Sequence, residues 1–304
     1  MVLFRRLALV TTIFAYLLIA LGGVVRVSGS GLGCPDWPLC HGRPYPPADL
    51  HAILEYSHRA AGSVTGVLII ATVVMAWVVF RQRRPLVAWL ASASLMGVVG
   101  EGLLGGVVVA HDLAPWLVLV HLGLAMMIIG FLVATGVMAM PASAGIPDRT
   151  FRRLAAVATG STYLMLLTGS TVVASNADDA CRAWPLCGNG FGLSFAGVGV
   201  FTMLHRGAVL VIGGLLLHVL STAVTRWRRV RGVRLIAGAT LAVFVLEVAV
   251  GAGSAFTGGA FFNGLHVALA TLVWAGALAT ALLALPRADS DVAPSHVAVQ
   301  RRPA

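Results

Sequence analysis

Charged side chains are scarce in this sequence. Only 11% of the 304 residues are Asp, Glu, Lys or Arg, and lysine is absent altogether. Soluble globular domains carry about 25% charged residues, so this scarcity excludes a soluble domain. The hydrophobic share of 59% predicts an all-α integral membrane protein that crosses the bilayer several times. The absence of lysine fits a GC-rich bacterial coding bias better than a binding role.

Long apolar runs account for most of the chain, and each is close to the roughly 20 residues that a helix needs to cross a bilayer. The first run follows Arg5-Arg6 as a signal sequence would, but no clear cleavage site follows it, so it is expected to remain as a span. The polar segment 287–304 is expected to be a disordered tail. The eight predicted transmembrane helices lie at about 8–27, 58–80, 86–109, 115–139, 153–174, 203–225, 233–254 and 264–285.

The formal net charge of +10 could suggest a nucleic-acid partner, but the arginines are distributed as membrane topology requires. They gather in alternate loops, and the intervening loops hold the cysteines. By the positive-inside rule, both termini are expected in the cytoplasm, and the cysteine loops on the outer face of a bacterial plasma membrane. The bilayer, not nucleic acid, is therefore the expected partner. The clusters are Arg5 and Arg6; Arg81, Arg83 and Arg84; Arg149, Arg152 and Arg153; Arg226 to Arg234; and Arg287.

The chain contains one unit twice. The sequence Cys-Pro-Asp-Trp-Pro-Leu-Cys at 34–40 recurs as Cys-Arg-Ala-Trp-Pro-Leu-Cys at 181–187, and a His-Arg pair follows each second cysteine by eighteen residues. Each copy holds an even number of spans, so both copies should enter the membrane in the same orientation. The predicted fold is therefore two parallel-repeat four-helix bundles, covering 1–148 and 149–286.

Two histidines per copy lie at matched positions among apolar residues: His58 and His121, then His205 and His266. His58 is expected to open its helix. A single intramembrane histidine would more often be a core residue, but four at duplicated positions favour ligation. Two imidazoles from facing helices are the usual axial pair of a heme iron, whereas zinc would need three or four ligands close together. The pattern predicts two heme sites near the outer face.

Charged residues accompany these histidines. Arg59 and Arg206 directly follow the first histidine of each copy. They are candidates for contacts with heme propionates, and equally for arginines that reach toward the interface. Glu101 and Glu247 are duplicated deep within helices and are interpreted as shared structural or heme-pocket groups.

Glu55 breaks the symmetry between the copies, because Thr202 stands at the corresponding position. On a helix, positions three apart share a face, so Glu55 could act on a molecule bound at His58. The alternative is a carboxylate near a helix start that the helix dipole stabilises.

The cysteines form two pairs, each with five residues between them, in outer loops where disulfides persist. Four cysteines permit three pairings, and the repeat favours Cys34 with Cys40 and Cys181 with Cys187. Each bond is expected to hold a lid over its bundle. A redox-active dithiol stays open as an alternative for the first pair.

Together these features resemble the heme A synthases, bacterial membrane proteins that convert heme O to heme A for cytochrome oxidase. The match covers nearly the whole chain except the tail. One position departs from it, since similar proteins tend to have glutamine where Glu101 stands. The resemblance is carried by the eight-helix duplication, both cysteine pairs, and Glu55, His58, Arg59, His121, His205, Arg206 and His266.

The resemblance implies a division of labour between the copies. His205 and His266 would hold a resident heme b, while His58 and His121 would receive heme O. The reaction oxidises a porphyrin methyl group to a formyl group through two successive hydroxylations, with Glu55 as the catalytic carboxylate. Implied partners are the farnesyltransferase that makes heme O and an electron-transfer protein. No interface motif marks the handover from the farnesyltransferase, and the sequence is compatible with a homo-oligomer.

Two other functions share these ligands. A diheme b-type electron-transfer protein, such as a quinol oxidoreductase, usually places its hemes toward opposite sides of the membrane. All four histidines here are expected near one face. A non-catalytic heme carrier would leave Glu55 without a task, so the sequence favours the enzyme.

Overall fold

Eight long α-helices form the fold of this protein in a computed structural model that describes residues 1–175, 177, 181–187, 192–193 and 197–287. All eight are long and apolar enough to cross a membrane, which confirms the predicted all-α multi-pass architecture. The helices are α1 (Val2–Val27), α2 (Leu50–Phe80), α3 (Pro85–Ala110), α4 (Pro115–Met138), α5 (Arg149–Ala174), α7 (Gly199–Thr225), α8 (Arg231–Thr257) and α9 (Ala260–Leu283).

Several helices begin before their apolar runs do. The largest difference is in α2, which begins at Leu50 because the Asp49 side chain caps it by accepting a hydrogen bond from the Ala52 amide. His58 was expected to open this helix and instead lies about two turns inside it. Hydropathy detects the lipid-facing part of a helix and misses a polar first turn, so this prediction was wrong.

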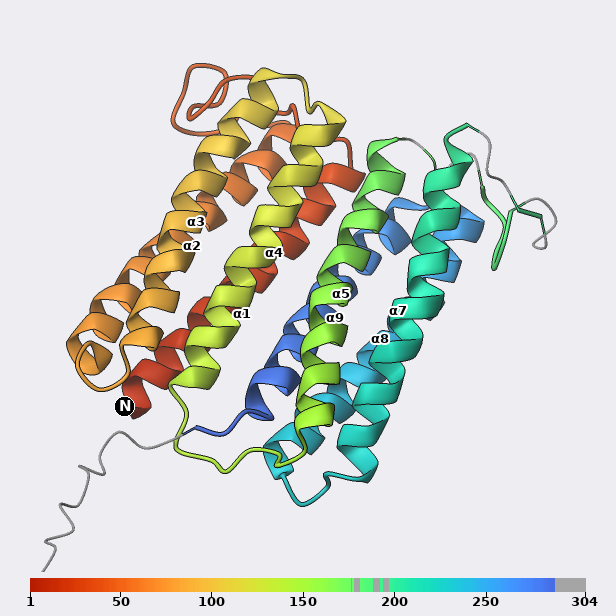
Figure 1. The fold of residues 1–304 in the computed structure, drawn as a ribbon. Coiled ribbons are helices and arrows are strands. Elements are labelled where there is room, and N and C mark those ends of the chain that lie inside the picture. Colours follow the sequence, from red (N-terminus) through yellow and green to blue (C-terminus); the bar gives the residue numbers. More distant parts are fainter. Residues whose placement is uncertain (176, 178–180, 188–191, 194–196, 288–304) are drawn as a thin grey trace, which may run out of the picture.

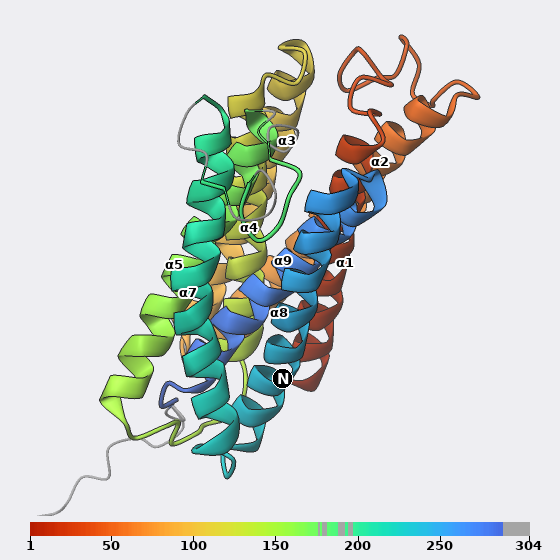
Figure 2. The same ribbon diagram turned by 90° about the vertical axis from the view of Figure 1, so that its right-hand side faces the viewer.

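The helices pack as two closed rings of neighbours. In the first ring α1 contacts α2, α2 contacts α3, α3 contacts α4, and α4 returns to α1. In the second, α5, α7, α8 and α9 repeat this order of contacts. Figure 1 shows the rings side by side, and Figure 2 shows α5 and α7 opposite α8 and α9 in the second. The contacts thus group α1 to α4 in one ring and α5 to α9 in the other.

The rings meet where α9 packs on α1 and α4, and where α4 also contacts α5. The indole N–H of Trp274 on α9 donates a 2.9 Å hydrogen bond to the Met126 carbonyl of α4. Trp274 also packs beside Gly130, where an added Cβ would lie 3.4 Å from the indole ring. A buried indole needs a partner for its N–H, so this bond fixes how the two helices meet.

The two cysteine loops lie at the same end of the molecule, opposite the N-terminus, the α4–α5 connection and the end of α9 (Figure 1). At the opposite end, arginines bind backbone carbonyls: Arg5 donates to Ala139, and Arg84 to Met140. Arg287, which the sequence placed in the tail, pairs through its backbone with Ser143. The rest of the expected tail, 288–304, lies outside the described residues.

Candidate functional site

Each of the four histidines packs against a glycine of a neighbouring helix. A Cβ added at these glycines would lie only 2.9–3.4 Å from the imidazole Cε1 atom. At the three tighter positions the methyl group of alanine would displace the ring, so glycine lets the imidazole approach the adjacent backbone closely. The four pairs are Gly22–His58, Gly105–His121, Gly169–His205 and Gly251–His266.

The structure brings His205 and His266 close together. The rings of His205 and His266 have centroids 6.4 Å apart and planes at 87°. Two imidazoles that bind opposite faces of one metal, each through a bond of about 2 Å, have centroids roughly 6 Å apart. The spacing therefore fits an axial pair. His58 and His121 occupy the corresponding positions in the first half, each packed on a glycine.

A carboxylate lies beside one histidine of each pair. Glu101 Oε1 is 3.1 Å from His121 Nδ1, and Glu247 Oε1 is 3.0 Å from His266 Nδ1. These are ion-pair distances, although the angles fall short of an aligned hydrogen bond. Histidines that bind metals usually present the other ring nitrogen to a carboxylate or carbonyl, which fixes the ring and its tautomer. Glu101 and Glu247 are thus placed to orient the imidazoles of His121 and His266.

Glu55 is buried, with only 4% of its surface exposed, and binds the first cysteine loop. Its Oε2 accepts a 2.7 Å hydrogen bond from the Cys34 amide, and its Oε1 pairs with the Arg59 guanidinium one turn later on α2. Oε2 therefore joins the loop to the helix that carries His58, and Oε1 holds Arg59 on that same helix. The three-residue spacing from Glu55 to His58 did not indicate the bonds of Glu55 to the Cys34 amide and Arg59.

Arg59 is the main anchor of this loop. Besides Glu55, its two terminal nitrogens donate to the carbonyls of Asp36, Leu39 and Cys34 at 2.7–2.8 Å. These four bonds occupy the four hydrogens of those nitrogens, so Nε–H is the remaining donor for any ligand. Sequence reasoning missed this anchoring role.

Arg206 repeats the anchoring in the second half with fewer bonds. It donates to the Cys181 carbonyl at 3.1 Å, to the Cys181 sulfur at 3.2 Å and to the Pro185 carbonyl at 3.3 Å. The identical eighteen-residue spacing from cysteine to His-Arg was the available signal for this role.

Both expected disulfides form, Cys34–Cys40 and Cys181–Cys187, so the predicted pairing is confirmed. Both loops also contain a cis Trp-Pro peptide bond. In the first loop Asp36 accepts hydrogen bonds from the Gly42 and His41 amides, and these bonds lower the pKa of its carboxyl group.

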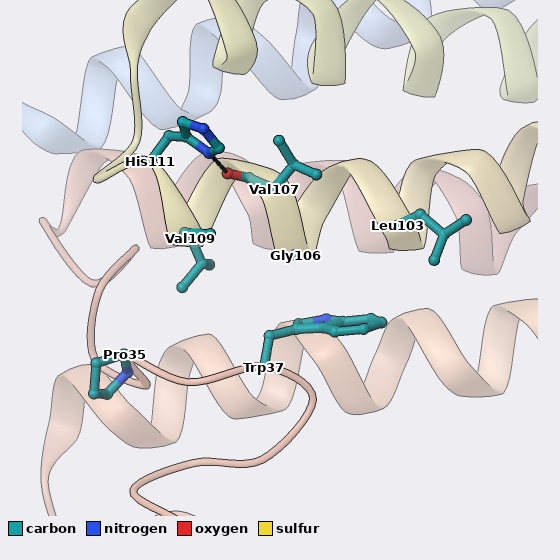
Figure 3. A pocket seen from close by; sticks show the side chains of 8 residues that line it. Pro35, Trp37, Leu103, Gly106, Val107, Val109 and His111 are labelled. Atoms are coloured by element: carbon teal, nitrogen blue, oxygen red, sulfur yellow. Dashed lines mark hydrogen bonds between the residues drawn. The ribbon is translucent and has the colours of Figure 1, made fainter.

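An apolar cavity of about 320 Å³ lies between the first cysteine loop and the end of α3 (Figure 3). The Trp37 ring lies against Gly106, where an added Cβ would be 3.0 Å from the indole. The preceding residue, Gly105, faces His121. In the same view His111 Nδ1 lies 2.9 Å from the Val107 carbonyl at the helix end. Adjacent glycines of α3 therefore connect the loop with the first histidine pair.

Known proteins share the pattern of this chain. The COX15-CtaA family, described as "Cytochrome oxidase assembly protein", matches residues 5–278. Heme A synthase from Shouchella clausii is 26% identical, over 83% of this chain and 87% of its own length. Heme A synthases from Alkalihalophilus pseudofirmus and Bacillus pumilus are each 28% identical, the former over 95% of this chain and 97% of its own, the latter over 68% and 71%. The chain therefore belongs to the COX15-CtaA family of cytochrome oxidase assembly proteins.

Proposed function

We propose that this protein is a heme A synthase, a membrane oxidoreductase that converts heme O to heme A by oxidising one methyl group to a formyl group in two successive hydroxylations. Family membership and the names of the relatives support this activity. The observation that carries it in the structure is the duplicated histidine pair, each ring packed on a glycine and, in the second half, spaced as an axial pair.

His205 and His266 would hold a resident heme b in the second half, 149–286, and His58 and His121 would bind the substrate heme O in the first, 1–148. A bound heme b supplies one-electron redox chemistry. The protein's own contribution is to present imidazoles from facing helices and to orient two of them through Glu101 and Glu247.

Glu55 is the proposed catalytic carboxylate, and it would accept a proton as the methyl carbon is oxidised. Its position supports this role, because it lies on the same helix as His58 and three residues before it. Hydrogen bonds from the Cys34 amide and Arg59 hold the carboxylate in one orientation. The second half, with Thr202 at this position, would have no proton acceptor there.

The proposed topology places both termini in the cytoplasm and the cysteine loops on the outer face of a bacterial plasma membrane. The end of the molecule at which Arg5 and Arg84 bind backbone carbonyls would then face the cytoplasm, as the positive-inside rule requires. Heme O would arrive from the farnesyltransferase that produces it, and a separate protein would exchange electrons. Enzyme fusions to the α1–α2 loop and to the C-terminus would test the orientation.

The decisive experiment compares hemes extracted from cells that express the wild-type chain, Glu55→Gln, or neither. We expect heme A with the wild-type protein only, and heme O with unchanged heme b in the Glu55→Gln protein. Heme A at the wild-type level from Glu55→Gln would overturn the catalytic role. If the wild-type protein contained two hemes b and yielded no heme A, it would instead be a diheme electron-transfer protein.

A further inference from the structure

His58 and His205 occupy closely similar environments in the two halves. Each projects from the second helix of its ring and packs its Cε1 atom on a glycine, with 3.0 Å from the Gly22 position to His58 and 2.9 Å from Gly169 to His205. The corresponding backbone carbonyls of Leu18 and Met165 also lie near the two rings. A difference between the two imidazoles must therefore come from the side chains around them.

That difference lies in the residue just before each glycine. In the second half it is Thr168, whose hydroxyl oxygen is 3.0 Å from His205 Nδ1. In the first half it is Leu21, which has no polar atom in its side chain. His58 Nδ1 is buried and forms no hydrogen bond with any described residue. Leu21 therefore stands at the position that corresponds to Thr168, one residue before the glycine that contacts the imidazole.

The Thr168 hydroxyl also defines which nitrogen of His205 carries the proton. It donates its single hydrogen to the Met165 carbonyl at 2.7 Å, so its oxygen must accept from His205 Nδ1–H. Nδ1 is then the protonated nitrogen, and the Nε2 lone pair is left for iron. His121 and His266 have the carboxylates of Glu101 and Glu247 beside Nδ1, which favour the same tautomer. Among the four histidines, His58 alone lacks a side-chain acceptor at Nδ1 within the described residues.

We propose that Thr168 is a positioning residue that locks His205 in the orientation and tautomer of a permanent iron ligand, and that Leu21 leaves His58 as a releasable ligand. The inference rests on the proposed function. A substrate site must bind heme O and release heme A in every cycle, so its histidine ligands have to dissociate from the iron each time. A resident cofactor has no such need. The anchored histidine thus belongs to the retained heme and the unanchored one to the exchanged heme.

The test uses the full-length protein purified with its heme and measures the rate at which heme passes to excess apomyoglobin. We expect Thr168→Val to release heme b about 10- to 100-fold faster than the wild type, the usual cost of losing a partner of a metal-binding histidine. Thr168→Ser keeps the hydroxyl and should restore the slow release. Its electron paramagnetic resonance spectrum should also match the wild type, whereas that of Thr168→Val should shift as the ring reorients.

Thr162→Val is the matched control, because Thr162 lies on the same helix and bonds only its own Ala158 carbonyl among the described residues. Equal heme loss from Thr168→Val and Thr162→Val, with unchanged spectra, would overturn the inference. If Thr168→Val does not accumulate, the reciprocal variant Leu21→Thr decides. Loaded with heme O, it should release that heme at least tenfold more slowly than the wild type, and unchanged release would count against the proposal.

The outcomes separate this inference from the proposed function. Faster heme loss from Thr168→Val in a protein that makes no heme A would keep the positioning role and refute the synthase activity. Heme A synthesis by the wild type, with heme retention unaffected in Thr168→Val and in Leu21→Thr, would support the synthase activity and refute the positioning role.

Discussion

The two cysteine loops are built from the same sequence pattern but are held down differently. In the first, the buried carboxylate of Glu55 links the Cys34 amide to Arg59. In the second, the hydroxyl of Thr202 at the corresponding position donates to the Ala177 carbonyl at 2.9 Å, and Arg206 has no carboxylate among its described partners. One scaffold therefore supports a charged anchor in one half and a neutral anchor in the other. At this position the first half presents a carboxylate and the second a hydroxyl.

Exchanging Glu55 and Thr202 between the two halves should have the largest effect, and the effect should be on heme A formation. We expect Glu55→Thr to reduce heme A formation by at least 100-fold, the usual contribution of a general base, while heme b stays bound. Thr202→Glu should leave heme A formation nearly intact, because the second half would not bind the substrate. Heme extraction from cells that express each variant measures both. Loss of activity in Thr202→Glu with activity retained in Glu55→Thr would reverse the roles of the halves.

Replacing Arg59 should destabilise the protein more than replacing Arg206. Arg59→Leu leaves the buried Glu55 without its counter-charge, so we expect it to destabilise the protein by about 3–5 kcal/mol. Arg206→Leu removes hydrogen bonds to neutral groups and should cost about 1–3 kcal/mol. Thermal unfolding of the purified proteins in detergent would rank them. The double variant Glu55→Gln with Arg59→Leu should recover part of the larger loss, and no recovery would argue against the ion pair as its cause.

Glycine substitutions should distinguish the heme contacts from ordinary helix packing. Gly169→Ala would push on His205, so we expect an altered heme spectrum and weaker heme retention. Gly207→Ala is the control, since no atom lies within 4 Å of a Cβ there. It should keep the wild-type spectrum and stabilise α7 by about 0.5–1 kcal/mol through helix propensity. In the first half, Gly105→Ala should be milder than Gly22→Ala, because its contact of 3.4 Å is looser.

Acid should loosen the first loop selectively, and this is the smallest expected effect. The pKa of Asp36 is lowered by the Gly42 amide, so its contribution to loop stability is present above the unfolded pKa and disappears as the pH falls through the folded one. The protection of the His41 and Gly42 amides from hydrogen exchange, relative to the intrinsic rate at the same pH, should therefore fall at low pH. Asp36→Asn should remove this pH dependence. The second loop has Ala183 at this position and should not respond.

Much of this architecture was predictable from local patterns. Apolar runs located all eight helices, since a bilayer-spanning helix must satisfy its backbone internally and present apolar side chains. The repeat identified the four histidines and the cysteine pairing. Helix starts were less predictable. Helix α2 begins two turns before its apolar run, because the Asp49 side chain caps it there.

The polar contacts of the site were not predictable, because they join residues far apart in the chain. Arg59 binds carbonyls 20–25 residues away, and Thr168 meets His205 across 37 residues. No periodicity marks a threonine that faces an imidazole on another helix. Comparison of the copies shows that Thr168 corresponds to Leu21. Only the packing of α5 on α7 shows that the Thr168 hydroxyl lies beside His205.

The sequence by itself determined the membrane class, the eight long apolar helices of the described residues and the residues that recur in each half, because hydrophobicity and repetition are properties of the chain order. Tertiary structure decided which atoms those residues engage. Glu55 links a loop to a helix, the glycines contact the imidazoles, and among the described residues His58 alone of the four histidines has no polar side chain beside its Nδ1. Hydrogen bonds depend on distances of about 3 Å and on direction, and only the packed helices set these.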